Sequence, residues 1–269
     1  MKFFPLFICS ALLALVNGCA THVEKSPAAT TAQTNPPQME TVVPHAALIP
    51  APRLNPTNTT WLNRHARFVE QAKRGGVDLL FMGDSITDFW RNRGSNVWNQ
   101  YYAPMHAANF GIGGDRTQHV LWRIENGELD GIHPKVCVLL IGTNNSKDDS
   151  PDDIAAAIKK IIGDFHEKTP ETKILLLGIF PRGPRTNSVA QSEEAAQRMK
   201  TIHAVNEIIS KYDDGGKTVK YLYFGDRFLD ADGKIPKEIM PDQLHPSAQG
   251  YQIWADAMNP TLEQMMAAR

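Results

Sequence analysis

The sequence predicts a three-layer α/β/α fold, in which helices cover both faces of a central parallel sheet. Five apolar runs have the character of buried strands and lie at 77–83, 107–113, 135–142, 173–180 and 219–225. They alternate with segments in which apolar residues recur at helical spacing. Parallel strands need crossover connections and bury both faces, so this alternation predicts a doubly wound, five-stranded sheet.

The segment after Ser150 carries the clearest helical signal. Ser150 suits an N-cap, Pro151 suits the first helical position, and Asp152 and Asp153 complement the positive end of the helix dipole. Apolar residues then recur at helical spacing up to Phe165, and this stripe must pack against another element. Similar stripes predict helices near 61–72, 119–124, 199–209 and 251–265.

Composition and length restrict the class of protein. Of the 269 residues, 42% are hydrophobic and 21% are charged, which is typical of a globular chain. The net charge of -1 and the pI near 6.8 reveal no excess of basic residues, so nucleic acid is not expected as a partner. The chain after residue 56 has the length of a single domain, which we place at 57–269.

The first 19 residues predict an export signal. Lys2 precedes an apolar run, Phe3 to Val16, that is too short to span a bilayer comfortably. The end of this segment, "LVNGC", resembles a bacterial lipoprotein box, in which an acylated Cys19 would anchor the protein to the membrane of the cell envelope. The alternative is ordinary cleavage after Ala20, which would release the protein into the periplasm or the medium.

Residues 20–56 are rich in Pro, Thr, Ala, Gln and Asn and have no sustained apolar period. This composition predicts a disordered tether between the anchor and the domain. A flexible segment of that length would let the domain stand clear of the lipid surface.

Residues capable of chemistry follow the predicted strands at their carboxyl ends, where ligands bind in doubly wound sheets. Ser85 follows the first strand in "FMGDSITDFW", "GIGGD" follows the second, and Asn144 lies in the "GTNN" after the third. Near the end of the chain, "PDQLHP" supplies Asp242 and His245. Each feature has an alternative explanation: a helix N-cap for Ser85, a tight turn for the glycines, a loop bond for Asn144, a helix cap for Asp242 and surface exposure for His245.

The sequence lacks the motifs of several other enzyme classes. In "GIGGDR", Arg116 stands where a dinucleotide-binding fingerprint needs its third glycine, and no phosphate loop ending in Gly-Lys-Ser/Thr occurs. No His-Glu-x-x-His zinc motif occurs, and Thr87 replaces the last glycine of the Gly-x-Ser-x-Gly elbow. The pattern therefore favours hydrolysis through a serine, with no metal or cofactor.

A serine hydroxyl is a weak nucleophile until a base takes its proton and a third group orients that base. Asp242 and His245 are three residues apart on one loop, close enough for the orienting bond. The negative oxygen formed by attack of Ser85 on a carbonyl also needs fixed donors. Candidate donors are the backbone amides of Ser85 and Gly114 and the side-chain amide of Asn144.

The blocks "GDSI", "NFGIGGDRTQHVLWRIENGEL", "GTNN" and "DQLHP" resemble, in order and spacing, those of the SGNH (GDSL-type) hydrolases. The stretch from Trp61 to about Gly183 is similar in particular to the catalytic subunits of platelet-activating-factor acetylhydrolase Ib. The blocks cover most of the domain and are highly specific in combination, whereas "GDS" alone would be weak. The resemblance implies a flavodoxin-like sheet (the SGNH hydrolase fold), no metal, and ester hydrolysis through an acyl-enzyme.

The same resemblance assigns roles to individual residues. It implies that Ser85 is the nucleophile, that Gly114 and Asn144 are oxyanion donors, that Asp242 is the orienting acid and that His245 is the base. Three segments resemble instead those of bacterial secreted relatives: the signal, the tether and the tail "FLDADGKIPKEIMPDQLHPSAQGYQIW". The alcohol half of the ester therefore stays open.

Ile86, Thr143 and Leu244 each neighbour one of these residues, so bulk there would shorten the acyl pocket. We expect acetyl or other short acyl esters as substrates, with O-acetylated carbohydrate as one class. A lysophospholipase or thioesterase acting on longer chains is the alternative enzyme, and a surface binding module without catalysis is the alternative from another class. Arg182 and Arg185 either contact an anionic or sugar leaving group or face solvent. The sequence also leaves a homodimer open.

Overall fold

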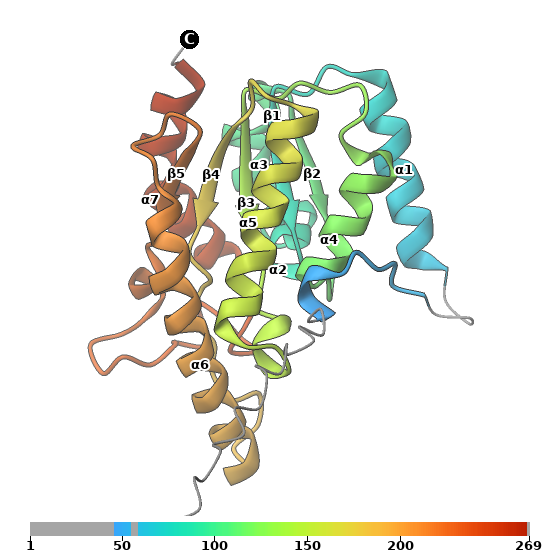
Figure 1. Cartoon of the computed structure of the whole chain (residues 1–269). Helices are drawn as coiled ribbons and strands as arrows, with labels where there is room; N and C mark the ends of the chain where they lie inside the picture. The colour runs from blue at the N-terminus through green and yellow to red at the C-terminus, as the bar shows by residue number, and fades with distance from the viewer. Residues whose placement is uncertain (1–45, 55–58, 268–269) are drawn as a thin grey trace, which may run out of the picture. The chain divides into compact units, whose positions relative to one another are not determined.

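The computed structural model describes residues 46–54 and 59–267, which belong to one compact unit. Its centre is a sheet of five parallel strands in the order β2-β1-β3-β4-β5 (Figure 1). The strands are β1 Leu79–Gly83, β2 Ala107–Gly111, β3 Val136–Leu140, β4 Lys173–Leu177 and β5 Val219–Leu222. Each strand lies inside the apolar run that predicted it, so the predicted parallel sheet is confirmed.

Helices cover both faces of this sheet (Figure 1). One face packs against α1 Thr60–Arg74, α4 Thr117–Arg123, α5 Pro151–Lys168 and α6 Val189–Ile209. The other packs against α2 Ser85–Asp88, α3 Ser95–Tyr101 and α7 Ala248–Ala267. Short turns of 3₁₀ helix lie at Ala46–Leu48, Phe89–Arg91, Ala103–Met105, Asn145–Lys147, Ser210–Tyr212 and Gly225–Phe228, and a π-helical turn lies at Ile124–Glu128. The predicted three layers are therefore confirmed.

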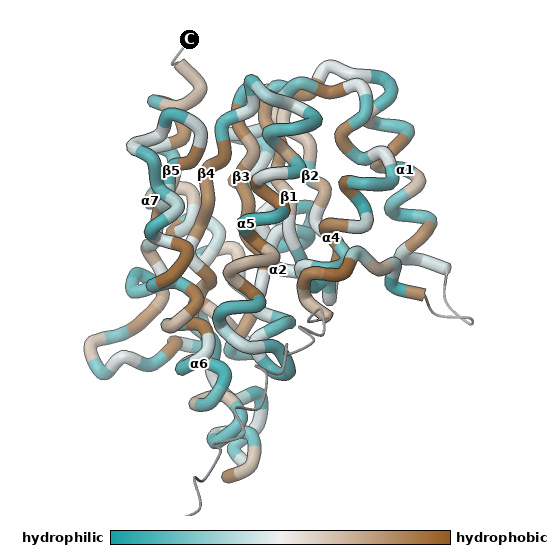
Figure 2. The backbone as a smooth tube through the Cα atoms, in the orientation of Figure 1, coloured by the Kyte–Doolittle hydropathy of each residue, from teal (hydrophilic) through white to brown (hydrophobic). Residues whose placement is uncertain are grey.

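Successive strand residues point to opposite faces, which divides the core into two apolar layers. Leu80 and Met82 of β1 pack in the same layer as Phe68 of α1, whereas Phe81 packs in the layer of Trp254 from α7. Figure 2 shows the strands as mostly hydrophobic, whereas the helices alternate between hydrophobic and hydrophilic stretches. Full burial of one such side chain stabilises the fold by roughly 1.5–3 kcal/mol, which explains why runs apolar on both faces form this sheet.

The folded part of the chain begins earlier than residue 57. Residues 46–54, assigned to the tether from their composition, pack on the domain: Ala47 is fully buried and its carbonyl accepts from Thr117 Oγ1 at 2.9 Å. The Ala51 N–H donates to the Gln118 carbonyl at 3.1 Å. The predicted boundary at 56 is therefore wrong, because small apolar residues bury well even in a proline-rich segment.

The signal, the acylation of Cys19 and the first part of the tether fall outside the described residues, and they stay predictions. Within residues 46–54 and 59–267, none of the helices combines the length and the apolar character needed to cross a bilayer.

The carboxyl ends of the strands lie together at the lower edge of the sheet in Figure 1. Strand β1 lies between β2 and β3, so the chain order reverses there, and such a reversal opens a crevice for ligands. Ser85 follows β1, Gly114 follows β2 and Asn144 follows β3. The segment between β5 and α7 carries Asp242 and His245.

Candidate active site

Ser85, His245 and Asp242 form one hydrogen-bonded chain at this edge of the sheet. The Ser85 Oγ and the His245 Nε2 are 2.8 Å apart, and the His245 Nδ1 lies 2.6 Å from the Asp242 Oδ2. A carboxylate only accepts hydrogen bonds, so the His245 Nδ1–H donates to Asp242 and Nε2 is left to accept the Ser85 proton. The fold thus joins Ser85 to an imidazole 160 residues away in sequence.

The turn between β1 and α2 holds Ser85 in place. Asp84, rather than Ser85, is the N-cap of α2, because its Oδ1 accepts the Ile86 N–H at 2.9 Å. This excludes the helix-cap explanation for Ser85. A Cβ on Gly83 would lie 2.2 Å from the Leu140 carbonyl oxygen, so only glycine lets the two strands end this close together.

The loop from Asp242 to His245 is fixed by its own hydrogen bonds. Asp242 Oδ1 accepts the His245 N–H at 2.8 Å, so one carboxylate orients both the backbone and the ring of His245. Gln243 between them has a φ of +60°, in the left-handed region that non-glycine residues rarely adopt. Its carbonyl accepts the Gly183 N–H at 2.8 Å, and its side chain donates to the Ile235 carbonyl at 3.0 Å. These contacts stabilise a strained turn, a feature common at functional sites.

Burial and hydrogen bonding set opposite charge states on the two partners. Burial lowers the pKa of His245 below its ordinary 6.5, and the hydrogen bond with Asp242 offsets only part of that fall. Burial acts to raise the pKa of Asp242, but hydrogen bonds from the ring and backbone of His245 outweigh it and hold that pKa below 3.8. At neutral pH His245 is therefore uncharged and Asp242 ionised, as a general base and its orienting acid require.

The loop after β2 brings Gly113 and Gly114 beside Ser85. A Cβ on Gly113 would lie 3.8 Å from the Ser85 Cβ. Gly114 has a φ of +81°, which favours glycine, and its N–H has no hydrogen bond within the described part of the chain. Asn144 donates one side-chain hydrogen to the Asp115 carbonyl at 2.8 Å and retains a second. The structure thus gathers Ser85, Gly114 and Asn144 at the ends of three adjacent strands.

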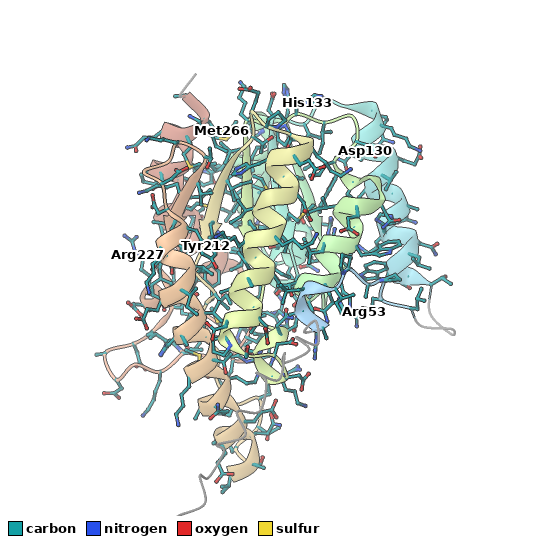
Figure 3. The ribbon with its side chains drawn as sticks, viewed as in Figure 1. Arg53, Asp130, His133, Tyr212, Arg227 and Met266 are labelled. Atoms are coloured by element: carbon teal, nitrogen blue, oxygen red, sulfur yellow. The ribbon has the colours of Figure 1, made fainter. Side chains whose placement is uncertain are left out.

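Arg53 contacts this glycine loop. Its Nη1 donates to the Gly113 carbonyl at 2.6 Å, and the guanidinium lies where a side chain on Gly114 would be. Figure 3 shows Arg53 on the segment before α1, beside the lower end of the fold. The C=O and N–H of a trans peptide point in opposite directions, so a bond to the Gly113 carbonyl also fixes the direction of the Gly114 N–H. The role of Arg53 could not be predicted from the sequence, because no pattern distinguishes one arginine in a proline-rich segment.

Two groups of charged residues stabilise the same glycine loop, one through Asp88 and the other through Asp115. Asp88 accepts from Arg64 at 2.5 Å and from Arg91, and its Oδ2 also accepts the Gly113 N–H at 3.3 Å. Asp115, which follows Gly114, lies 2.9 Å from Arg123 in a fully buried ion pair. The contacts of Asp88 with Arg64 and Gly113 span 24 and 25 residues, so no local pattern could have revealed them.

Of the three residues predicted to line the acyl pocket, only one lines a cavity. Ile86 and Thr143 are each only 1% exposed, so they have almost no surface with which to line a pocket, and that part of the prediction is wrong. Ile86 belongs to the apolar core beneath α2, and the Thr143 hydroxyl accepts from Arg182 at 3.2 Å. Leu244 does line a cavity, which it shares with Asn144.

Comparison with known proteins places this chain in a family of ester hydrolases. The GDSL-like lipase/acylhydrolase family matches residues 81–253. Platelet-activating factor acetylhydrolase IB subunit alpha1 of Homo sapiens is 34% identical over 207 residues, which cover 77% of this chain and 84% of the human protein. Subunit alpha2 of Rattus norvegicus is 36% identical over 191 residues, covering 71% and 78% of the two chains.

Solved structures agree on the fold. A GDSL-like lipase from Bacteroides thetaiotaomicron superposes with a TM-score of 0.57 at 18% identity, covering 74% of this chain and 97% of the lipase. An acetyl xylan esterase superposes with a TM-score of 0.53 at 18% identity, covering 68% and 98%. At such identities the likeness concerns the architecture alone.

Proposed function

Because this chain belongs to the GDSL-like lipase/acylhydrolase family and hydrolyses esters, we propose that it is a serine esterase that removes short acyl groups, acetyl in particular. The observation that carries this proposal is the hydrogen-bonded chain from Asp242 through His245 to Ser85. The names of the relatives, which are acetylhydrolases, support acetyl as the acyl group.

In the first half of the reaction Ser85 Oγ attacks the ester carbonyl while its proton passes to the His245 Nε2. Asp242 stabilises the imidazolium that forms. The carbonyl oxygen gains a negative charge, which the N–H groups of Ser85, Gly114 and Asn144 are placed to bind. Collapse of this intermediate breaks the bond to the alcohol, which leaves with the proton from His245, and the acyl group stays on Ser85.

In the second half water replaces the alcohol. His245 takes a proton from the water, whose oxygen attacks the acyl carbonyl, and the same donors bind the negative oxygen again. Cleavage of the bond to Ser85 returns the proton to Oγ and releases the carboxylic acid. The cycle needs no group besides water and the substrate.

A longer acyl chain is the second candidate. A cavity of about 500 Å³ lies beside Gln243, and apolar side chains of Pro181, Met199, Leu229 and Ile235 contribute to its lining. Such a cavity could hold an alkyl chain, as a lysophospholipase or thioesterase would need. Removal of acetyl from carbohydrate is the narrower form of the leading proposal.

Purified protein assayed with p-nitrophenyl acetate, butyrate and octanoate tests the acyl preference. We expect the highest kcat/KM with acetate, and Ser85→Ala should abolish turnover of all three without changing the melting temperature. A higher kcat/KM with octanoate would favour the longer-chain enzyme. Full activity of Ser85→Ala would contradict the serine mechanism, and no turnover by the intact protein would favour the binding module.

For the cell we propose export and attachment to the envelope through an acylated Cys19, with free secretion as the alternative. The apolar leader and the "LVNGC" sequence support this. Metabolic labelling with a palmitate analogue should mark the protein, and Cys19→Ser should remove the label. An unlabelled wild-type protein would contradict the anchor.

A further inference from the structure

A cavity of about 350 Å³ opens beside Asn144 and Leu244. Its lining carries four cationic side chains and one carboxylate: Lys147, Arg182, Arg185, Arg198 and Glu194. We propose that these four cations form a subsite, called here the cationic subsite, that binds a carboxylate or phosphate group on the alcohol half of the substrate ester. This inference rests on the proposed esterase function and adds the class of substrate.

The position of the cationic subsite couples it to the reaction. It shares Asn144 with the proposed oxyanion donors, and Leu244 precedes His245 directly. Arg182 follows β4, the strand beside β3 at the same edge of the sheet. The N-terminal half of α6, which supplies Arg198, extends past the carboxyl ends of the strands and forms a wall there (Figure 1). An anion held in this cavity therefore lies next to the ester group that Ser85 would attack.

Arg182 is a buried cation without a direct ion-pair partner in the part of the chain that the structure describes. Its side chain donates to the carbonyl and hydroxyl of Thr143 at 3.3 and 3.2 Å, and no carboxylate in the described part of the chain forms an ion pair with it. Two carboxyl groups act on Arg182 from beyond ion-pair distance, Glu194 more strongly than Asp84. Glu194 pairs with Arg198 at 3.2 Å, and burial raises the pKa of Asp84 to about 7, so Asp84 supplies only part of a negative charge at neutral pH. A buried unpaired charge is costly, and an anionic ligand would supply the missing counter-charge.

Arg198 is fixed in the wall of the cavity. It donates to the Thr143 carbonyl at 2.9 Å and to Ser146 Oγ at 3.1 Å, and it pairs with Glu194 at 3.2 Å. Lys147 and Arg185 are exposed at the mouth and have no ion pair or hydrogen bond within the residues described. The subsite thus combines two positioned guanidinium groups with two free cations. Guanidinium groups match carboxylate and phosphate by paired hydrogen bonds.

The charge belongs to the alcohol half because an acetyl group carries none. A purely structural explanation also exists, since Arg182 and Arg198 both hold the Thr143 carbonyl and so the loop that carries Asn144. That explanation predicts that the loss of these cations affects charged and neutral esters equally. The subsite instead predicts a larger loss for charged esters, so a comparison of charged with neutral esters distinguishes the two explanations.

Three aryl acetates test the subsite: para-acetoxybenzoate, para-acetoxyphenyl phosphate and the neutral methyl para-acetoxybenzoate. For the wild-type protein at low salt we expect a higher kcat/KM for at least one anionic ester than for the neutral one. In the double variant Lys147→Gln/Arg185→Gln the ratio of anionic to neutral kcat/KM should fall about fivefold, since exposed charge pairs are individually weak. Arg198→Gln should lower it about tenfold, because it removes a positioned charged donor.

Lys200→Gln is the matched control. It removes the same charge from the same helix, but Lys200 is exposed and does not line the cavity, so the ratio should not change. If the ratio of anionic to neutral kcat/KM is larger for the phosphate ester than for the carboxylate ester, the natural alcohol is phosphorylated. If it is larger for the carboxylate ester, the alcohol is a sugar acid or another carboxylate. Added salt should reduce the ratio in the wild-type protein more than in the double variant.

Equal kcat/KM for neutral and anionic esters in the wild-type protein would overturn the subsite and leave the esterase proposal intact. If kcat/KM fell by the same factor for all three esters in both variants, the subsite would also be overturned, in favour of the loop-holding explanation. If wild-type protein hydrolysed none of the acetates, both proposals would fail together.

Discussion

The guanidinium of Arg53 donates to the Gly113 carbonyl at 2.6 Å, on the peptide whose N–H belongs to Gly114. A charged donor on the carbonyl fixes the orientation of this peptide and polarises its N–H, which makes Gly114 a better oxyanion donor. The segment that precedes the first helix thereby reaches the proposed site of reaction.

We predict that Arg53→Ala lowers kcat for p-nitrophenyl acetate about tenfold with little change in KM, because the oxyanion forms only during the reaction. Arg53→Lys should restore part of kcat, and added guanidinium should partly rescue the alanine variant. Arg67→Ala, which removes an exposed arginine of α1, is the control. A loss confined to KM, or equal losses in the alanine and lysine variants, would contradict this role.

Asp242→Asn should lower kcat about 10³- to 10⁴-fold. The amide oxygen can still accept the backbone N–H of His245, so the loop should remain folded, but the amide cannot stabilise an imidazolium or hold the required tautomer. Steady-state kinetics with circular dichroism as a folding check measures this. Asp232→Asn, on the exposed part of the same segment, should retain full activity, and a similar loss there would point to a general effect of charge.

The pH profile should reflect the lowered pKa of His245. The base acts in its neutral form, so kcat/KM should be constant at neutral pH and fall as His245 becomes protonated in acid. Since burial holds the pKa of His245 below 6.5, the midpoint of this fall should lie below 6.5. A midpoint clearly above 6.5 would mean that His245 is stabilised as a cation, contrary to the observed environment.

Gln243 should be sensitive to the shape of its replacement. At a φ of +60°, glycine is unstrained, whereas a β-branched residue is strained by roughly 1–2 kcal/mol. Both Gln243→Gly and Gln243→Val lose the bond to the Ile235 carbonyl, so their difference isolates the backbone. We expect the valine variant to melt several degrees below the glycine variant and to have the lower kcat. Equal melting temperatures would contradict the strained turn.

Much of the fold could be predicted because its determinants are local. Runs such as 135–142 are apolar on both faces, and Ser150 caps α5 by accepting the Asp153 N–H at 3.2 Å, as predicted. Carboxyl ends of parallel strands share one edge, so the sequence alone predicts that Ser85, Gly114 and Asn144 lie near one another.

The remainder depends on tertiary contacts that leave no local pattern. Residues 46–54 resemble a tether in composition, yet Ala47 is buried against α4 and α5 and Arg53 lies over Gly113. Ile86 and Thr143 neighbour Ser85 and Asn144 in sequence, but both point into the interior. Proximity in sequence was sufficient to predict the catalytic loops. It was not sufficient to predict which side chains line the pocket.

Covalent labelling with diethyl p-nitrophenyl phosphate tests the central claim, that Ser85 is the activated nucleophile. We expect time-dependent inactivation, one diethylphosphoryl group per chain, and peptide mapping that places it on Ser85; labelling should slow greatly in Asp242→Asn. Inactivation with Ser85 unmodified, or full activity after complete labelling of Ser85, would contradict the account.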